Sequence, residues 1–301
     1  MTIEEHVALG GPPWRLRANQ AYEALQDIDV SVVITLYNYA GYIEECFESL
    51  VASIQFDVSI SVEVVIIDDA STDDGALVLL ASSLAHRQIP LLLVKSRHNG
   101  GLSHARNLGL RLSRGSAAFI LDADNTVKPP CISRLYRCLR ETGANAAYGQ
   151  IEKISALDGS IVGLVSNQRF DLARLLAGNY IDAMAMFSIA ALFEAGLYDV
   201  GMIHGWEDYD IWLAFGFAGM RVEYVEEVLA CYRVHADSML NRLNEHVPKV
   251  GRYLYLKYQQ LLPQPAADSL LFGVPVALLF QSEACVPSPD PGPLPDVGTE
   301  P

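Results

Sequence analysis

The segment Ala117-Ala118-Phe119-Ile120-Leu121-Asp122-Ala123-Asp124 decides how this chain folds. Its five apolar residues are typical of a buried strand, and two carboxylates leave the end of that strand. Because side chains alternate along an extended chain, Asp122 and Asp124 can point the same way. Their oxygens are hard donors that suit Mg²⁺ or Mn²⁺ carrying phosphate oxygens. Two further acidic motifs, Asp68-Asp69 after a second apolar run and Glu207-Asp208, set this pair apart from a chance Asp-x-Asp.

More short apolar runs lie on the N-terminal side, at residues 30–34, 62–67 and 91–94. The segments between the runs have the spacing of amphipathic helices: 42–53, 73–84 with Ser71 or Thr72 as cap, 102–111 and 130–141. This alternation predicts an α/β fold with a mostly parallel central sheet flanked by helices. Such sheets bind ligands at the carboxyl ends of their strands, and the polar groups fall there: Tyr37-Asn38, Asp68-Asp69, Asn99-Gly100-Gly101 and Asp122-Ala123-Asp124.

Past Gly143 the pattern changes to strand-like runs at 144–151, 182–187 and 222–232, with a hairpin indicated by Asp158-Gly159. These runs predict a mixed half that continues the same sheet. Helical spacing follows Glu207-Asp208, so we expect the acidic pair to begin a helix. The segment 241–282 is expected to be helical, serving as packing or as a partner surface. The proline-rich and glycine-rich end, 283–301, predicts a disordered tail.

Composition excludes several classes of partner. The chain has 301 residues, is 51% apolar, and carries a net charge of -15 from 36 acidic and 21 basic side chains. That charge disfavours nucleic acid and the anionic face of a bilayer. Five scattered cysteines without Cys-x-x-Cys spacing predict reduced thiols. The longest apolar stretch, 270–280, is shorter than the roughly 20 residues that span a bilayer. We therefore predict a cytoplasmic protein without a transmembrane span, with peripheral membrane contact left open.

Six segments in this order resemble the inverting family 2 glycosyltransferases of the GT-A fold, which have a Rossmann-like sheet. They are Val32-Val33-Ile34-Thr35-Leu36-Tyr37-Asn38, Ile67-Asp68-Asp69-Ala70-Ser71-Thr72-Asp73, Asn99-Gly100-Gly101-Leu102-Ser103-His104-Ala105-Arg106-Asn107, Asp122-Ala123-Asp124, Gly205-Trp206-Glu207-Asp208 and Tyr232-Arg233-Val234-His235. The resemblance runs from residue 30 to about residue 238. It implies an N-terminal extension, 1–28, and one domain, 29–240. The domain would have a nucleotide-binding half, 29–128, and an acceptor half, 129–240.

On the donor side, the resemblance implies that Asp69, with Asp68 beside it, accepts a hydrogen bond from the nucleobase. The alternative for this acidic stretch is helix capping, and both roles are compatible if Ser71 supplies the cap. Tyr37 is expected either to stack on the base or simply to pack. Arg106 would supply a fixed cation to the nucleotide or its diphosphate. The remaining residues implied for the nucleotide-sugar site are Thr35, Asn38, Asn99, Gly101, Asp122 and Ala123.

For the metal, the resemblance implies that Asp122 and Asp124 bind Mn²⁺ or Mg²⁺, with Asp124 the more direct ligand. His235 resembles a further metal ligand found in part of the family. The alternative is that the two carboxylates cap the turn before Pro129-Pro130. A bound cation would neutralise charge that develops on the departing nucleotide diphosphate.

For catalysis, inversion requires a single displacement, and one carboxylate suffices as the base that deprotonates the acceptor hydroxyl. Asp208 matches the catalytic aspartate of the family, and Glu207 would contact the acceptor. The alternative is an acidic helix start that the helix dipole stabilises. Trp206 is expected to be an acceptor platform or a buried tryptophan.

Together these features predict a metal-dependent transferase. It would move a sugar from a nucleotide diphosphate-sugar to a hydroxyl of a glycan, a lipid-linked saccharide or a small acceptor, in glycan or polysaccharide biosynthesis. The Gln-x-x-Arg-Trp signature of processive synthases does not follow Asp208, so we expect non-processive transfer. The alternative function is a catalytically silent nucleotide-sugar sensor or scaffold of the same fold.

Overall fold

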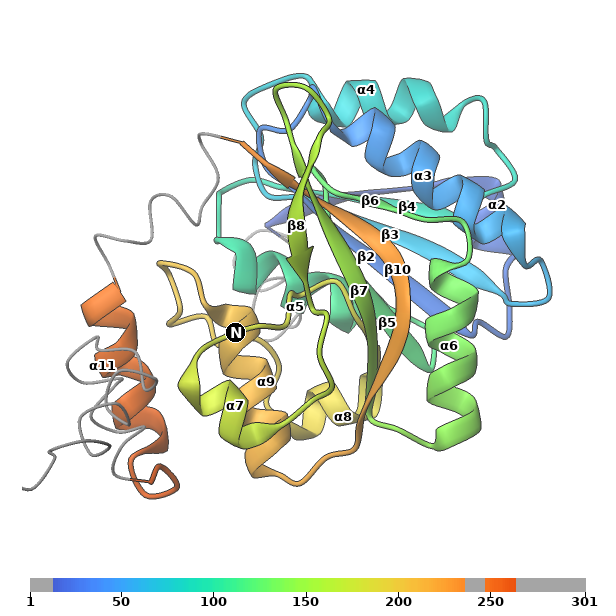
Figure 1. The fold of residues 1–301 in the computed structure, drawn as a ribbon. Helices are drawn as coiled ribbons and strands as arrows, with labels where there is room; N and C mark the ends of the chain where they lie inside the picture. The colour runs from blue at the N-terminus through green and yellow to red at the C-terminus, as the bar shows by residue number, and fades with distance from the viewer. Residues whose placement is uncertain (1–12, 236–246, 264–301) are drawn as a thin grey trace, which may run out of the picture.

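The computed structural model describes residues 13–235 and 247–263 (Figure 1). Its strands form one ten-stranded sheet in the order β1-β4-β3-β2-β5-β9-β7-β10-β6, with β8 paired to β7. In chain order the strands are β1 Trp14–Ala18, β2 Val30–Leu36, β3 Val62–Asp68, β4 Leu91–Ser96, β5 Ala117–Asp122, β6 Thr126–Val127, β7 Ala146–Ser155, β8 Ile161–Val165, β9 Met186–Ser188 and β10 Val222–Val234.

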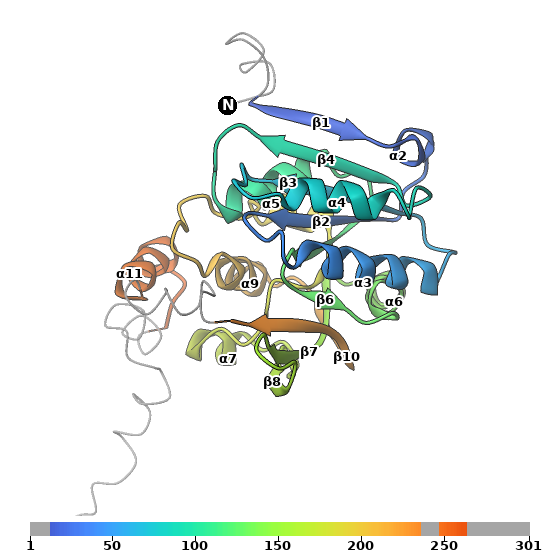
Figure 2. The same ribbon diagram turned by 90° about the horizontal axis from the view of Figure 1, so that it is seen from above.

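The first half of the sheet is parallel, because β4, β3, β2 and β5 pair side by side in one direction. The second half is mixed: β9 is antiparallel to β5 and β7, whereas β10 is parallel to β7. Figure 2 shows β1 beside β4 at one end of the sheet and β10 toward the other. The predicted α/β fold with a mostly parallel central sheet is confirmed, and strands from both predicted halves of the domain belong to one sheet.

Helices cover both faces of this sheet. One face packs against α3 Ile43–Phe56, α4 Gly75–Ser83 and α6 Cys131–Thr142. The other packs against α5 Leu102–Leu112, α7 Leu172–Ala177, α8 Ile189–Glu194, α9 Glu207–Phe217 and α11 Val247–Tyr258. The short α2, Gln20–Ala24, adjoins β4. Among the described helices none is both long enough and apolar enough to cross a membrane.

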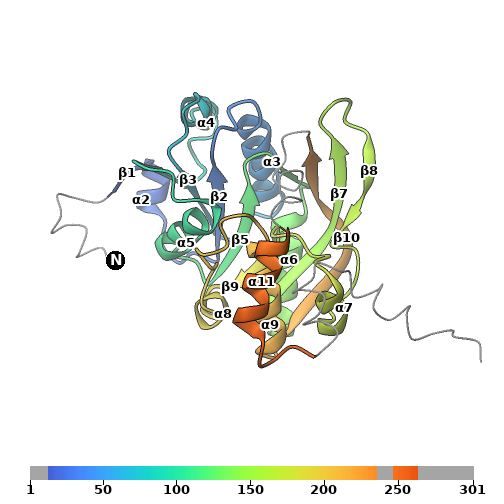
Figure 3. The ribbon, with the colours of Figure 1, turned by 90° about the vertical axis from the view of Figure 1, so that its left-hand side faces the viewer.

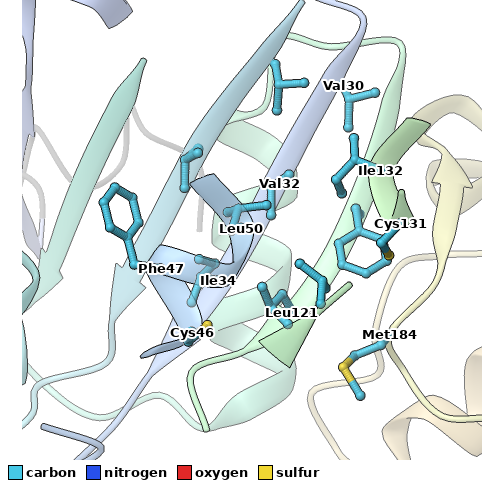
Figure 4. Packing of buried hydrophobic residues seen from close by; sticks show 14 of the residues in the cluster. Val30, Val32, Ile34, Cys46, Phe47, Leu50, Leu121, Cys131, Ile132 and Met184 are labelled. Atoms are coloured by element: carbon cyan, nitrogen blue, oxygen red, sulfur yellow. The ribbon is translucent and has the colours of Figure 1, made fainter. Parts of the chain in front are cut away.

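The core fixes where the strands end. All seven residues of β2 are buried, and Val32 and Ile34 pack with Leu50 of α3 and Leu121 of β5 (Figure 4). Burying each such side chain contributes about 1.5–3 kcal/mol. In the register of the sheet, Leu36 of β2 pairs with Asp68 of β3, and Thr35 pairs with Asp122 of β5. The polar residues that follow each strand are therefore held at one edge of the sheet.

Three local features of the structure differ from what the sequence predicted. Helix α4 begins at Gly75, after Asp74, and has no side-chain cap, so Ser71 and Thr72 do not cap it. Of the predicted strand 182–187 only Met186–Ser188 forms; earlier, the Asp182 carboxylate accepts from Met184 N, which competes with strand pairing. Strand β1 lies within the predicted extension 1–28 and pairs with β4, so this part belongs to the sheet.

Other expectations on the second half hold. The Asp158-Gly159 turn joins the antiparallel strands β7 and β8, which project as a hairpin in Figure 3. Helix α9 begins at Glu207, as the helical spacing predicted. The predicted tail, 283–301, the apolar stretch 270–280 and most of the segment 241–282 lie outside the described residues.

Candidate active site

The predicted site residues gather at the carboxyl ends of β2, β3 and β5. Thr35 on β2 and Asp122 on β5 are register partners, and Thr35 Oγ1 donates to Asp122 Oδ1 at 3.0 Å. Ala123 is buried, and its amide donates to the carbonyl of Thr35 at 3.2 Å. Asp68 ends β3 opposite Leu36. Strand pairing alone therefore places the acidic motifs beside each other.

Asn38 joins the loop after β2 to the loop after β3. It adopts a left-handed conformation with φ 58°, which asparagine tolerates better than most residues. The backbone amide of Asn38 donates to Ser71 Oγ at 3.1 Å, and its side-chain Oδ1 accepts from the backbone amide of Thr72 at 2.8 Å. These bonds occupy the two residues that were expected to cap α4. The neighbouring Tyr37 is 44% exposed, so its ring is accessible to a ligand.

Asp68 and Asp69 are buried and hold the surrounding loops. Asp68 Oδ1 accepts from Ser71 N at 2.7 Å, and Lys95 Nζ lies 3.2 Å from Asp68 Oδ2. The Asp69 carboxylate accepts from Gly100 N at 2.9 Å and from Gly101 N at 2.8 Å. Gly101 has φ 86°, a conformation that favours glycine.

These contacts bear on the expected recognition of a nucleobase. Asp69 is fixed at the end of β3, and the amides of the 99–101 loop fill part of its capacity as an acceptor. A carboxylate offers about four lone-pair sites, so acceptor capacity remains. Asn99 Oδ1 accepts from Gly101 N at 3.0 Å, which makes Asn99 part of the same loop turn.

Arg106 of α5 connects the acidic motifs. Its side chain is buried, with Nη2 2.9 and 3.0 Å from the two oxygens of Asp122 and Nη1 2.7 Å from Glu207 Oε1. Burial lowers the pKa of Arg106, but Asp122 and Glu207 more than offset this and hold it above its usual range. From the sequence, Arg106 is expected to supply a cation to a nucleotide or its diphosphate. In the structure its terminal nitrogens instead face Asp122 and Glu207.

Asp124 faces a different partner from Asp122. Its Oδ2 lies 3.2 Å from His235 Nε2, and the ring of Tyr42 stacks on His235 with centroids 5.9 Å apart. Burial raises the pKa of Asp124, the charge of Asp122 adds to this, and His235 opposes it. Arg233 Nε donates to the Asp124 carbonyl at 3.0 Å, which ties the end of β10 to the turn after β5.

The turn after β5 is closed by the backbone, since Asn125 N donates to the Asp122 carbonyl at 3.0 Å. Within the described residues, no group of three or more His, Cys, Asp or Glu side chains is arranged to hold a metal ion by itself. The carboxylate oxygens of Asp122 and Asp124 and the imidazole nitrogen of His235, which lies 3.2 Å from Asp124, are nevertheless donor types that suit Mn²⁺ or Mg²⁺.

Asp208 lies at the start of α9, after a tight turn in which Gly205 has φ 103° and Trp206 φ 65°. Tyr209 N donates to Asp208 Oδ1 at 2.7 Å, and Asn179 Nδ2 donates to Asp208 Oδ2 at 3.0 Å. Burial raises the pKa of Asp208 to about 8; the charge of Glu207 adds to this, and Arg106 opposes it. A carboxylate with a pKa near neutrality is suited to general-base catalysis.

Two further residues belong to this site and were not assigned a role from the sequence. Burial raises the pKa of Asp182 to about 7; the negative charges of Asp122 and Asp124 add to this, and Arg106 opposes it. A lone acid in the apolar run Ile181-Asp182-Ala183-Met184 was a usable signal. Asn179, which contacts Asp208, stands in no motif that would have revealed it.

Comparisons of the sequence place this geometry in a family. The model of "Glycosyl transferase family 2" matches residues 31–198. Glycosyltransferase GlyG of Streptococcus pneumoniae serotype 4 is 27% identical over 146 residues, which are 48% of this chain and 46% of the relative. Succinoglycan biosynthesis protein ExoO of Rhizobium meliloti is 34% identical over 148 residues, 49% of this chain and 39% of the relative. The chain thus matches less than half the length of either relative.

Solved structures give the same fold. TarS 1-349 of S. aureus, in complex with UDP-GlcNAc, has a TM-score of 0.66 and 17% identity, covering 86% of this chain and 77% of that one. Mannosyltransferase PcManGT of Pyrobaculum calidifontis, in complex with GDP-Man and Mn²⁺, has a TM-score of 0.58 and 18% identity, covering 93% and 85%. These likenesses confirm the predicted GT-A fold. With the family model matching more than half of its length, the chain belongs to glycosyl transferase family 2.

Proposed function

We propose that this protein transfers a sugar from a nucleotide diphosphate-sugar to an acceptor hydroxyl, with inversion at the anomeric carbon. The observation that carries the proposal is the buried Arg106, which contacts Asp122 at 2.9 Å and Glu207 at 2.7 Å. Asp122 belongs to the donor side of the family pattern and Glu207 to the acceptor side. A single guanidinium that binds both supports one continuous site, where donor and acceptor can meet.

The nucleotide would lie against the carboxyl ends of β2 and β3. Asp69 is fixed there by Gly100 and Gly101, and the ring of Tyr37 is exposed beside it. Asp68, Thr35, Asn38 and Asn99 hold the surrounding loops in place rather than projecting freely. In support of such a donor, TarS is described with UDP-GlcNAc and PcManGT with GDP-Man.

The diphosphate end of the donor would lie near Asp122 and Asp124. These carboxylates, together with His235, would hold Mn²⁺ or Mg²⁺, as supported by their donor types and by the Mn²⁺ of PcManGT. A bound cation supplies positive charge to the diphosphate oxygens. In this arrangement Arg106 keeps Asp122 ionised and oriented, because its Nη2 contacts both oxygens of that carboxylate.

The acceptor would approach Asp208. Its carboxylate takes the proton of the acceptor hydroxyl as the hydroxyl oxygen bonds to the anomeric carbon and the bond from that carbon to the diphosphate oxygen breaks. Asn179 and Tyr209 N orient the carboxylate, so its geometry does not depend on the acceptor. Glu207 would contact the acceptor while bound to Arg106.

We further propose that transfer is non-processive and serves glycan or polysaccharide biosynthesis. The name of ExoO, a succinoglycan biosynthesis protein, supports that setting. The acceptor would be a glycan, a lipid-linked saccharide or a small molecule. The cytoplasmic location predicted from composition stays a prediction.

Turnover by wild type and Asp208→Asn tests the function. We expect UDP-GlcNAc or GDP-mannose, with Mn²⁺, to raise the melting temperature of both proteins, because a ligand that binds the native state stabilises it. Release of nucleotide diphosphate should fall by about 10²–10⁴ in Asp208→Asn, the range expected when a general base is lost. Equal turnover by the two proteins would disprove the base assignment. Donor binding without turnover by wild type, across a panel of acceptors, would favour the silent sensor.

A further inference from the structure

Helix α11 contacts the beginning of α9, the helix that carries Asp208. Figures 2 and 3 show α11 lying beside α9. Lys257 Nζ lies 2.7 Å from Asp210 Oδ2 and 2.8 Å from Asp199 Oδ2. Tyr258 OH donates to Asp210 Oδ1 at 2.8 Å. Asp210 is only 1% exposed, so these contacts replace its hydration.

The two carboxylates that Lys257 joins lie on either side of the proposed acceptor residues. Asp199 precedes Glu207 and Asp208 along the chain, and Asp210 follows them. Just before Asp199, the backbone of Tyr198 is held by Asn107, whose side chain accepts from Tyr198 N at 2.9 Å and donates to its carbonyl at 2.7 Å. The residue before segment 199–210 is therefore fixed to α5. Lys257 binds the first and the last residue of the segment and so links its two ends.

The conformation of this segment needs such support. Trp206 has φ 65°, a left-handed conformation that costs roughly 1–3 kcal/mol for a residue other than glycine. It immediately precedes Glu207 and Asp208. Strained residues persist only where surrounding contacts outweigh their cost.

Electrostatics makes Lys257 the critical contact. Asp199 and Asp210 both approach one nitrogen within 2.8 Å, so their negative charges lie close together. Among the described residues, Lys257 is the only cation that forms an ion pair with either carboxylate. Without it, Asp199 and Asp210 would repel each other, and Asp210 would keep an uncompensated buried charge.

We propose that Lys257 is a positioning residue for sugar transfer. By joining Asp199 and Asp210 it holds segment 199–210 in the conformation that brings Glu207 to Arg106 and presents Asp208 to the acceptor. This role rests on the proposed function, because it matters for turnover only if Asp208 acts on an acceptor. It assigns helix α11 a part in the reaction, outside the matched residues 31–198.

The positioning role differs from a purely stabilising one. Helix α11 also buries Val250, Leu254 and Tyr258, so it should stay docked when only the ammonium of Lys257 is removed. Among the described residues, Lys257 forms ion pairs with Asp199 and Asp210, and neither of these lies on β2, β3 or β5 of the donor side. Loss of the ammonium should therefore lower kcat and leave donor affinity unchanged.

The test compares full-length Lys257→Met with Lys249→Met, a matched loss of an exposed lysine on the same helix. We measure Kd, KM and kcat with UDP-GlcNAc and GDP-mannose in the presence of Mn²⁺, together with hydrogen exchange of amides 199–210. In Lys257→Met we expect exchange to accelerate and kcat to fall at least about tenfold, since small misplacements of reacting groups are costly. Donor Kd and KM should stay within about twofold. Lys249→Met should match wild type, and Lys257→Arg should recover most of the lost kcat.

If Lys257→Met does not fold, Asp199→Ala takes its place, because it releases one end of the segment without leaving a buried charge unpaired. Asp199→Ala should lower kcat, as expected for Lys257→Met, and leave the donor Kd unchanged. Unaltered exchange in 199–210, or unaltered kcat, would overturn the positioning role, as would an equal loss of donor binding and turnover. A wild type that turns over neither donor would overturn the proposed function instead. Hydrogen exchange of amides 199–210 does not depend on turnover, so it still shows whether Lys257 holds the segment in that case.

Discussion

At the scale of single residues, Arg106 and Asp208 show how burial sets the charge of a side chain. Arg106 stays charged although it is buried, because Asp122 and Glu207 bind its terminal nitrogens. Asp208 receives hydrogen bonds from Tyr209 N and Asn179 and forms no ion pair among the described residues. Burial and the negative charge of Glu207 raise the pKa of this carboxyl, so it is easier to protonate than an exposed one.

Asp208 should make stability depend on pH. Its pKa is 3.8 in an ordinary setting and about 8 in the fold, so between these values the folded chain binds a proton that the unfolded chain lacks. Stability must then fall as pH rises from about 4 to 8. Asp208→Asn has no carboxyl to deprotonate and should not lose stability in this way. Without metal, its melting temperature should therefore exceed that of wild type by a margin that grows toward pH 8.

Calorimetry of wild type and Asp208→Asn across that range measures the margin. A margin that stays constant with pH would show that the pKa of Asp208 is not raised in the fold. If Asp208 is the base, kcat/KM of wild type should also rise with pH toward about 8, where its carboxylate becomes deprotonated.

At the scale of elements, the site depends on how closely α5 packs on the sheet. Gly109 of α5 faces β2, where a Cβ on Gly109 would lie 2.4 Å from Val33 Cγ1. The absence of a side chain there lets α5 approach, and α5 carries Arg106 and Asn107 to their partners.

Gly109→Ala should therefore move α5 away from β2. Overpacking of this kind costs about 1–3 kcal/mol, and we expect a lower melting temperature and a lower kcat, because Arg106 shifts relative to Asp122 and Glu207. Gly41→Ala is the matched control, since a Cβ at Gly41 meets nothing within 4 Å. Thermal unfolding and turnover of both variants check this. A Gly109→Ala protein as stable as Gly41→Ala would show that α5 tolerates the methyl group.

At the scale of the whole molecule, the net charge of the chain should affect the proposed binding of a donor. The chain carries -15, and Asp122, Asp124, Asp182 and Asp208 of the site are among its acidic residues. A nucleotide diphosphate-sugar is itself an anion, and the buried cation of the site, Arg106, is bound to carboxylates.

Removal of divalent cations should therefore weaken donor binding at least about tenfold, which corresponds to about 1.4 kcal/mol. Titration of UDP-GlcNAc and GDP-mannose into chelator-treated protein, with and without added Mn²⁺, measures this loss. Asp124→Ala should bind the donor equally weakly in both conditions. Donor affinity that is unchanged by the chelator would argue against metal dependence.

The sequence by itself determined the parallel half of the sheet, strands β2 to β5. Each of the strands β2, β3, β4 and β5 was predicted to within two residues at either end, because apolar runs and helical spacing are local patterns. It also placed Asp68, Asp122 and Asp208 at element ends, where they lie. It did not determine what the side chains contact: Arg106 meets Glu207 across 101 residues, and Lys257 meets Asp210 across 47.

Only the tertiary structure decided those partners, and with them the absence of a Ser71 cap on α4 and the place of Asp182 in the site. The physical reason is that periodicity reports which face of an element is buried. A contact between side chains far apart in sequence depends instead on how whole elements pack, and small offsets such as the close approach at Gly109 decide which atoms meet.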